Sequence, residues 1–225
     1  MNRLPAVTKN LLIINVLVCF AVHAAEKNGI ALDNILGLHF FMADDFRPYQ
    51  LVTYMFVHRE FSHIFFNMFA LFMFGRALES IWGAKRFLIF YLVSGIGAGL
   101  LQEIVQFVEY ETVFSSYTLV DMGYGNIPMA EFLNLWRTIG ASGAIYAILL
   151  GFGMSFPNER MFIFPIPVPI KAKYFVIGYV LIELALGFSG SADGIAHFAH
   201  LGGMLFGFAL IVYWRRTRKI GGPYV

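Results

Sequence analysis

Long apolar stretches separated by shorter polar ones run through the whole chain. A helix needs about 20 mostly apolar residues to cross the hydrocarbon core of a bilayer. Six stretches meet that requirement or nearly meet it, namely residues 11–25, 61–78, 87–101, 139–156, 174–188 and 194–214. None of them alternates polar and apolar residues, as the strands of a membrane barrel do. The pattern therefore predicts an all-α, polytopic membrane protein with six transmembrane helices.

The amino-acid composition agrees with this class and excludes several others. Of the 225 residues, 59% are hydrophobic and 13% are charged, whereas soluble domains average about 45–50% and about 25%. So hydrophobic a chain is not intrinsically disordered, and one cysteine cannot form a disulfide scaffold. A net charge of +2 gives no reason to expect a nucleic-acid partner. The expected partner is the lipid bilayer.

Lysine and arginine residues are distributed unequally between the predicted loops. With the N-terminus in the cytoplasm, 12 of the 16 basic residues fall on the cytoplasmic side, as the positive-inside rule requires. We expect a single membrane domain, residues 1–225, with a cytoplasmic N-terminus at 1–10, a core at 11–214 and a basic cytoplasmic tail at 215–225. The expected location is a bacterial inner (plasma) membrane. The first stretch also resembles a signal peptide, so its removal is an alternative.

The two longest predicted loops lie on the non-cytoplasmic side. Residues 26–60 form an external loop between the first two helices, and residues 102–138 join the third helix to the fourth. Within the second loop, residues 128–137 have a proline followed by apolar residues near helical spacing, which predicts a short interfacial helix. On the cytoplasmic side, the proline-rich residues 164–169 predict a stiff, extended linker.

Polar side chains within four predicted helices mark a candidate site, because polar groups at membrane depth are costly and usually face the bundle interior. A spacing of three or four residues places two side chains on one helix face. The pairs with this spacing are His63 and Asn67, Ser142 and Tyr146, and His197 and His200. Each pair taken singly is more typical of helix packing. Glu183 in the fifth helix is expected to pair with another buried group, and a proton relay is the alternative.

Ser142 and His200 together have the chemistry of a nucleophile and its base. A serine hydroxyl needs a base to react at neutral pH, and histidine is the side chain whose ordinary pKa suits that role. Small residues beside both side chains would let their two helices approach closely. These residues are Gly140, Gly143, Gly203 and Gly207.

The second predicted helix offers hydrogen-bond donors for the oxyanion that attack on an amide creates. His63 and Asn67 can both donate from one helix face, and the backbone N–H of Ser142 is a third donor because it lies near a helix start. A metal site built from His63, His197 and His200 is the alternative. Zinc needs ligands that converge tetrahedrally, and the chain has no HExxH motif. We therefore predict no metal. His197 lies one helical turn further out than His200, and we interpret it either as a residue that supports the site from behind or as a packing residue.

The chain resembles the rhomboid family of intramembrane serine proteases, and the resemblance covers all six predicted helices. The matching segments are residues 140–144 (Gly-Ala-Ser-Gly-Ala) with Tyr146, His200 with Gly203 and Gly207, residues 63–67 (His-Ile-Phe-Phe-Asn), residues 49–53 and 56–58 before the second helix, and residues 75–79 after it.

The resemblance implies a Ser142–His200 dyad without a carboxylate, an oxyanion hole that includes His63 and Asn67, and Tyr146 packed beside His200. It implies cleavage of transmembrane proteins near the extracytoplasmic membrane boundary through an acyl-enzyme, with no cofactor. A catalytically inactive relative that binds transmembrane clients and a transporter or channel are the alternatives. The sequence does not indicate an oligomeric state.

Overall fold

The structure is a computed structural model that describes residues 4–163, 166–189 and 196–217, and helices make up most of it. Five helical segments in this part of the chain are long and apolar enough to cross a membrane. They are α1 (Ala6–Glu26), the run of α4 (Phe61–Ala70), the π-turn η2 (Leu71–Gly75) and α5 (Arg76–Trp82), the run of α6 (Ala84–Glu109) and the π-turn η3 (Tyr110–Phe114), α9 (Ala172–Ser189) and α10 (His197–Arg216). The polytopic helical architecture is thus confirmed.

The fourth apolar stretch forms a shorter helix, α8 (Ser142–Ser155). It spans 14 residues, whereas the sequence predicted a helix over 139–156. The first predicted residue of the sixth span, 194, lies outside the described residues, as does most of the predicted basic tail.

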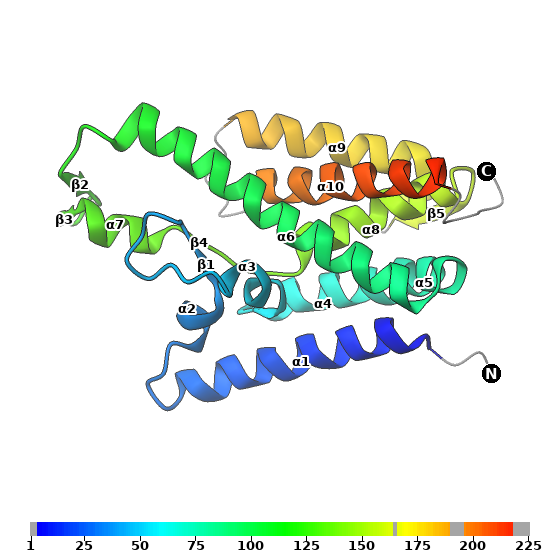
Figure 1. Ribbon diagram of the computed structural model, residues 1–225, viewed down its shortest axis with the longest axis horizontal. Coiled ribbons are helices and arrows are strands. Elements are labelled where there is room, and N and C mark those ends of the chain that lie inside the picture. Colours follow the sequence, from blue (N-terminus) through cyan, green and yellow to red (C-terminus); the bar gives the residue numbers. More distant parts are fainter. Residues whose placement is uncertain (1–3, 164–165, 190–195, 218–225) are drawn as a thin grey trace.

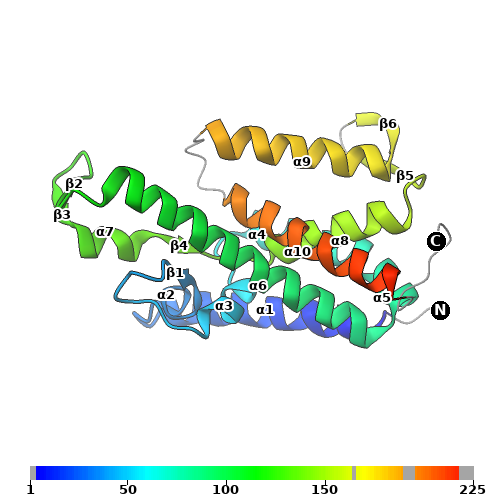
Figure 2. The same ribbon diagram turned by 45° about the horizontal axis from the view of Figure 1, so that its top comes forward.

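Helix α10 lies at the centre of the bundle, where it packs mainly against α6 and α8. Helices α9 and α1 lie on opposite sides of this central group (Figures 1 and 2). The beginning of α1 and the end of α10 are at the same end of the molecule (Figure 1). The loops before α4 and before α8 gather at the opposite end (Figure 1).

Short elements in these two loops tie them together. The first loop contains α2 (Leu32–Leu36), β1 (Leu38–His39), α3 (Gln50–Thr53) and the 3-10 turn η1 (Tyr54–Phe56). The second contains β2 (Leu119–Asp121), β3 (Asn126–Pro128), α7 (Met129–Leu135) and β4 (Arg137–Thr138). Antiparallel β2 and β3 pair with each other, and β1 pairs with β4. The β1–β4 pairing therefore fixes the segment that leads into α8 against the first loop.

Two loop predictions need correction. The sequence predicted that residues 102–138 form a loop, but residues 102–114 continue the third membrane helix. The predicted short helix within that loop is confirmed as α7. Within the predicted linker at 164–169, residues 166–169 lie in the strand β6 (Ile166–Lys171), which pairs antiparallel with β5 (Arg160–Ile163), and residues 164 and 165 lie outside the described residues. Proline is tolerated there because each strand has only one partner and its other edge needs no donors.

Helix α1 is anchored to the bundle by one buried carboxylate. Glu79 of α5 is 4% exposed and accepts hydrogen bonds from the backbone N–H groups of Val7 and Thr8 at 2.9 and 2.7 Å, and from the Thr8 hydroxyl at 2.7 Å. The first N–H groups of a helix have no partners within it, and a negative charge is favourable at that end. Glu79 therefore binds the start of α1.

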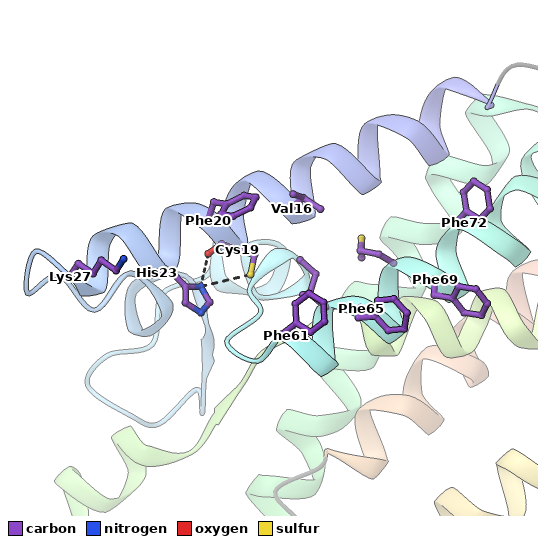
Figure 3. Close-up of a pocket in the computed structure, with 11 residues that line it drawn as sticks. Val16, Cys19, Phe20, His23, Lys27, Phe61, Phe65, Phe69 and Phe72 are labelled. Carbon is purple, nitrogen blue, oxygen red and sulfur yellow. Dashed lines mark hydrogen bonds between the residues drawn. The ribbon is translucent and has the colours of Figure 1, made fainter. Parts of the chain in front are cut away.

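An apolar groove of about 690 Å³ separates α1 from α4. Figure 3 shows Phe61, Phe65 and Phe69 in a row along α4, with Phe20 on α1 opposite them. These phenylalanine side chains are largely exposed at the surface of the protein. Exposed apolar groups are unfavourable in water but match the hydrocarbon of a bilayer. The phenylalanine-rich face is thus a surface suited to lipid acyl chains.

Candidate active site

Helix α8 begins at Ser142 because the residues before it cannot continue the helix. Gly140 has a φ of +118°, a value that favours glycine, and its N–H donates to the Tyr54 carbonyl at 2.9 Å. A Cβ at Gly140 would lie 2.6 Å from the His63 ring, so only glycine fits there. At about 1.5 Å per residue, α8 is about 21 Å long, roughly 9 Å shorter than a hydrocarbon core. The start of α8 can therefore lie below the membrane surface.

The hydroxyl of Ser142 meets the imidazole of His200. Ser142 Oγ lies 2.8 Å from His200 Nε2, and His200 is in the first turn of α10. Tyr146, one turn after Ser142, stacks on the His200 ring with centroids 4.1 Å apart and planes at 8°. The structure therefore brings together the two residues that the sequence predicted as nucleophile and base, and places Tyr146 beside them.

Close packing of α8 and α10 makes this contact possible. A Cβ at Gly203 would fall on the backbone carbonyl of Gly143, and one at Gly207 would lie 2.9 Å from the Ala147 Cβ. The backbones of the two helices therefore touch below the Ser142–His200 pair. The role predicted for Gly143, Gly203 and Gly207 is visible in this contact, whereas Gly140 lies against His63 instead.

On the other side of Ser142, α4 contributes His63 and Asn67. His63 lies against Gly140, as its closeness to a Cβ at that position indicates, and Asn67 is buried one turn further along. The Asn67 amide donates to His58 Nε2 at 3.0 Å. Because Nε2 accepts this bond, His58 is neutral and its Nδ1–H faces the Phe56 carbonyl at 3.3 Å.

His58 is a residue whose part in the site the sequence analysis missed. It is fully buried, and its ring lies edge-on to that of His63 at 4.8 Å between centroids. It therefore contacts both side chains of α4 that were predicted to bind the oxyanion. The signal in the sequence was a second histidine, besides His63, close to the start of the second apolar stretch, but spacing alone does not indicate contact across a turn.

The burial of His58 as a neutral imidazole predicts that acid destabilises the fold. Burial, with a smaller effect from His63, lowers the pKa of His58 to about 4, whereas in the unfolded chain it is about 6.5. Between pH 6.5 and pH 4 the unfolded chain therefore binds a proton that the folded protein does not. At 1.36 kcal/mol for each pH unit, wild type should lose about 3 kcal/mol of unfolding free energy in this window.

The measurement is the unfolding free energy in detergent at several pH values for wild type and His58→Gln. A glutamine carbonyl can still accept from Asn67 but does not titrate, so the variant should lose about 3 kcal/mol less on acidification. His23→Gln removes an exposed imidazole and should keep the wild-type slope. Equal slopes in wild type and His58→Gln would contradict the prediction.

A carboxylate lies behind His200, on the side away from Ser142. Glu183 of α9 is 4% exposed, and its Oε1 is 3.1 Å from His200 Nδ1. Its Oε2 accepts a hydrogen bond from His197 Nδ1 at 2.7 Å, and the Tyr146 hydroxyl also interacts with it. The expected pairing of Glu183 with a buried group is confirmed. Of the two interpretations of His197, the structure favours the supporting one, because its ring is bonded to Glu183.

Glu183, His197 and His200 could also hold a metal ion. Within the described part of the chain, they are the group whose donor atoms lie close enough together to do so. The ligand atoms of Glu183, His197 and His200 lie within 4.8 Å of one another, and two imidazoles with one carboxylate suit zinc. Two ligands about 2.0–2.1 Å from a tetrahedral zinc are roughly 3.3 Å apart. The 2.7 Å contact of His197 with Glu183 is instead the length of a charge-assisted hydrogen bond. As arranged, the carboxylate accepts a hydrogen bond from His197 Nδ1 and lies 3.1 Å from His200 Nδ1.

The chain is similar to known proteins over most of its length. Residues 45–217 match the Rhomboid domain. Rhomboid protein 1, mitochondrial, from Saccharomyces cerevisiae is 29% identical over 70% of this chain and 39% of its own length. Rhomboid protease GluP from Bacillus subtilis is 31% identical over 71% of this chain and 25% of its own length. Rhomboid protease GlpG from Haemophilus influenzae is 23% identical, with 84% of this chain and 82% of that protein covered.

The fold and the site define a multi-pass helical membrane protein in which a serine and a histidine from two helices meet inside the bundle. The match to the Rhomboid domain covers most of the chain, and the chain belongs to the rhomboid family. It spans less than half the length of the mitochondrial relative from yeast and of the protease from Bacillus subtilis.

Proposed function

We propose that this protein is an intramembrane serine endopeptidase that cleaves transmembrane-helix substrates. The observation that carries the proposal is the 2.8 Å contact of Ser142 Oγ with His200 Nε2. A nucleophile within hydrogen-bond reach of a base, with the base held by further groups, is the arrangement that activates serine. Two of the relatives named above are rhomboid proteases.

The proposed reaction proceeds through an acyl-enzyme. Ser142 Oγ attacks the scissile carbonyl carbon while His200 Nε2 takes its proton, and the C–N bond then breaks as His200 returns that proton to the leaving amine. Water, deprotonated by His200, attacks the ester and releases Ser142 with its proton restored. His63, the second amide hydrogen of Asn67 and the Ser142 N–H are the proposed donors to the oxyanion. Hydrolysis of this kind needs no cofactor.

The position of the pair favours substrates that are cut near the non-cytoplasmic boundary of the membrane. Ser142 and His200 both lie in the first turns of their helices, toward the end of the molecule where the loops gather (Figure 1). A helix hides its carbonyls in hydrogen bonds, so a substrate must unwind locally before attack. Small or helix-breaking residues near that boundary should therefore be favoured.

We also propose that the end of the molecule opposite these loops faces the cytoplasm, which places both termini there. Support comes from the basic residues at that end, where Arg215 also donates to the Met154 carbonyl at the end of α8 at 2.7 Å. The relatives include bacterial, mitochondrial and chloroplastic proteins. The charge asymmetry supports the orientation, and the bacterial inner membrane is our proposal for the location.

Reactivity of Ser142 with a fluorophosphonate probe tests the proposed function. Wild type in detergent should be labelled, with the adduct mapped to Ser142 by mass spectrometry, and Ser142→Ala should not be labelled. Ser155→Ala, which removes a buried serine at the far end of the same helix, should be labelled like wild type. Absence of labelling in wild type, with bound transmembrane clients, would favour an inactive relative, and flux through proteoliposomes without proteolysis would favour a transporter.

A further inference from the structure

We propose that Glu183 positions the histidine base, so that this protein uses a serine, a histidine and a glutamate on three membrane helices. The inference rests on the proposed function and corrects the carboxylate-free dyad that the family resemblance implied. It starts from the contacts of His200, whose two ring nitrogens face different partners. Nε2 lies 2.8 Å from Ser142 Oγ and Nδ1 lies 3.1 Å from Glu183 Oε1.

The carboxylate selects the tautomer of His200 that can act as a base. A neutral imidazole has one N–H and one lone pair. A carboxylate accepts and cannot donate, so its presence at Nδ1 favours the tautomer with the proton on that nitrogen. Nε2 is then left with its lone pair directed at the Ser142 hydroxyl. Glu183 also faces the positive charge that His200 carries once it has taken the serine proton. No proton needs to move to Glu183.

The surroundings of Glu183 fix its position. A carboxylate that is 4% exposed is costly unless it is paired and hydrogen-bonded. Its second oxygen accepts from His197 Nδ1 at 2.7 Å. Three residues of two adjacent helices, α9 and α10, are thus joined through one side chain. Tyr146 stacked on His200 restricts the ring in the remaining direction. Three sides of the base are therefore held.

The test compares kcat and KM of Glu183→Gln with those of wild type on a single-span substrate. A glutamine amide can donate to Nδ1, which would put the imidazole proton on Nε2, facing the serine. We expect kcat to fall at least about 100-fold with KM within about threefold, because a removed orienting carboxylate costs up to about 10⁴ in a serine protease triad. Glu183→Asp retains the charge and should recover part of the loss.

Glu103→Gln is the matched control, because Glu103 is also a buried glutamate of a membrane helix but accepts its hydrogen bond from the Phe41 N–H and not from a histidine. Its kcat should stay within about threefold of wild type. Nitrogen-15 NMR of ring-labelled histidine reports the tautomer independently of activity. The His200 signal should indicate Nδ1–H in wild type and lose that signature in Glu183→Gln. Both readouts use protein that retains its thermal unfolding midpoint.

Several outcomes would overturn the proposal. These are a wild-type kcat in Glu183→Gln, an unchanged tautomer, equal losses in the Glu183 and Glu103 variants, or inhibition of wild type by a zinc chelator, which would assign the cluster to a metal. Failure of the proposed function has a different signature. In that case Ser142→Ala would cleave the substrate at the same rate as wild type. Failure of the Glu183 proposal alone would leave Ser142→Ala inactive.

Discussion

Replacing His200 with phenylalanine should lower kcat about 10³–10⁴-fold while leaving the bundle folded. The phenyl ring keeps the stacking on Tyr146, whose centroid lies 4.1 Å from that of His200, but it removes both ring nitrogens. Ser142 then loses the imidazole that lies 2.8 Å from its hydroxyl, and the loss expected for a missing member of such a catalytic set is of this size. The measurement is single-turnover cleavage of a purified single-span substrate in liposomes.

His23→Phe is the control for this experiment because it makes the same substitution at an exposed position on α1. It should cleave at the wild-type rate. The rate of fluorophosphonate labelling should fall in parallel with cleavage in His200→Phe, since both reactions use the same nucleophile. A cleavage rate within tenfold of wild type would show that His200 is not the base.

The Ser142–His200 contact could be predicted from the sequence because small residues in each of the two helices mark the face that packs against a neighbour. Small residues at positions 140, 143, 203 and 207 indicate where two backbones can approach, and a reactive side chain next to such a face is brought along with it. What remained open was the exact start of α8, which depends on the backbone conformation of Gly140 and not on hydropathy.

The role of Glu183 could not be predicted in the same way. A single acidic residue in an apolar stretch indicates a buried partner, but several polar groups on other helices were candidates. The choice depends on the rotation of α9 about its axis, and a nearly uniformly apolar helix gives little indication of which face is turned inward. The contact of His58 with Asn67 was missed for a related reason. His58 lies in the turn before α4, where helical periodicity does not apply, so the spacing of the two residues does not predict their contact.

Loop structure was the least predictable part of the fold. The π-turn at 110–114 prolongs the third membrane helix through polar residues, beyond the point where hydropathy ends the span. The β5–β6 hairpin has prolines at positions 167 and 169, which usually argue against a strand. Each of the two strands pairs with only one neighbour, so the backbone position where proline lacks an N–H can face away from the partner strand. Local composition therefore predicted the wrong element. Whether a proline disrupts a strand depends on whether its missing N–H would have to bond to a neighbouring strand.

Replacing Gly203 with alanine should abolish most of the activity through the backbone alone. The added Cβ would fall on the Gly143 carbonyl, so α10 must move away from α8. Overpacking of this kind costs about 1–3 kcal/mol of unfolding free energy, and a displacement of about 1 Å at a reacting pair costs about 100-fold in rate. We therefore expect kcat to fall at least about 100-fold in protein that is still folded.

Gly178→Ala provides a matched control, because a Cβ at this position of α9 meets nothing within 4 Å. It should keep the wild-type kcat and gain up to about 1 kcal/mol of stability from helix propensity. Cleavage and unfolding midpoints are measured on both variants in the same detergent. If Gly203→Ala lost stability but kept its kcat, the contact of α8 with α10 would support the fold without setting the distance between Ser142 and His200. A fall in kcat far larger than the loss of folded protein is the result that ties the spacing of the two helices to catalysis.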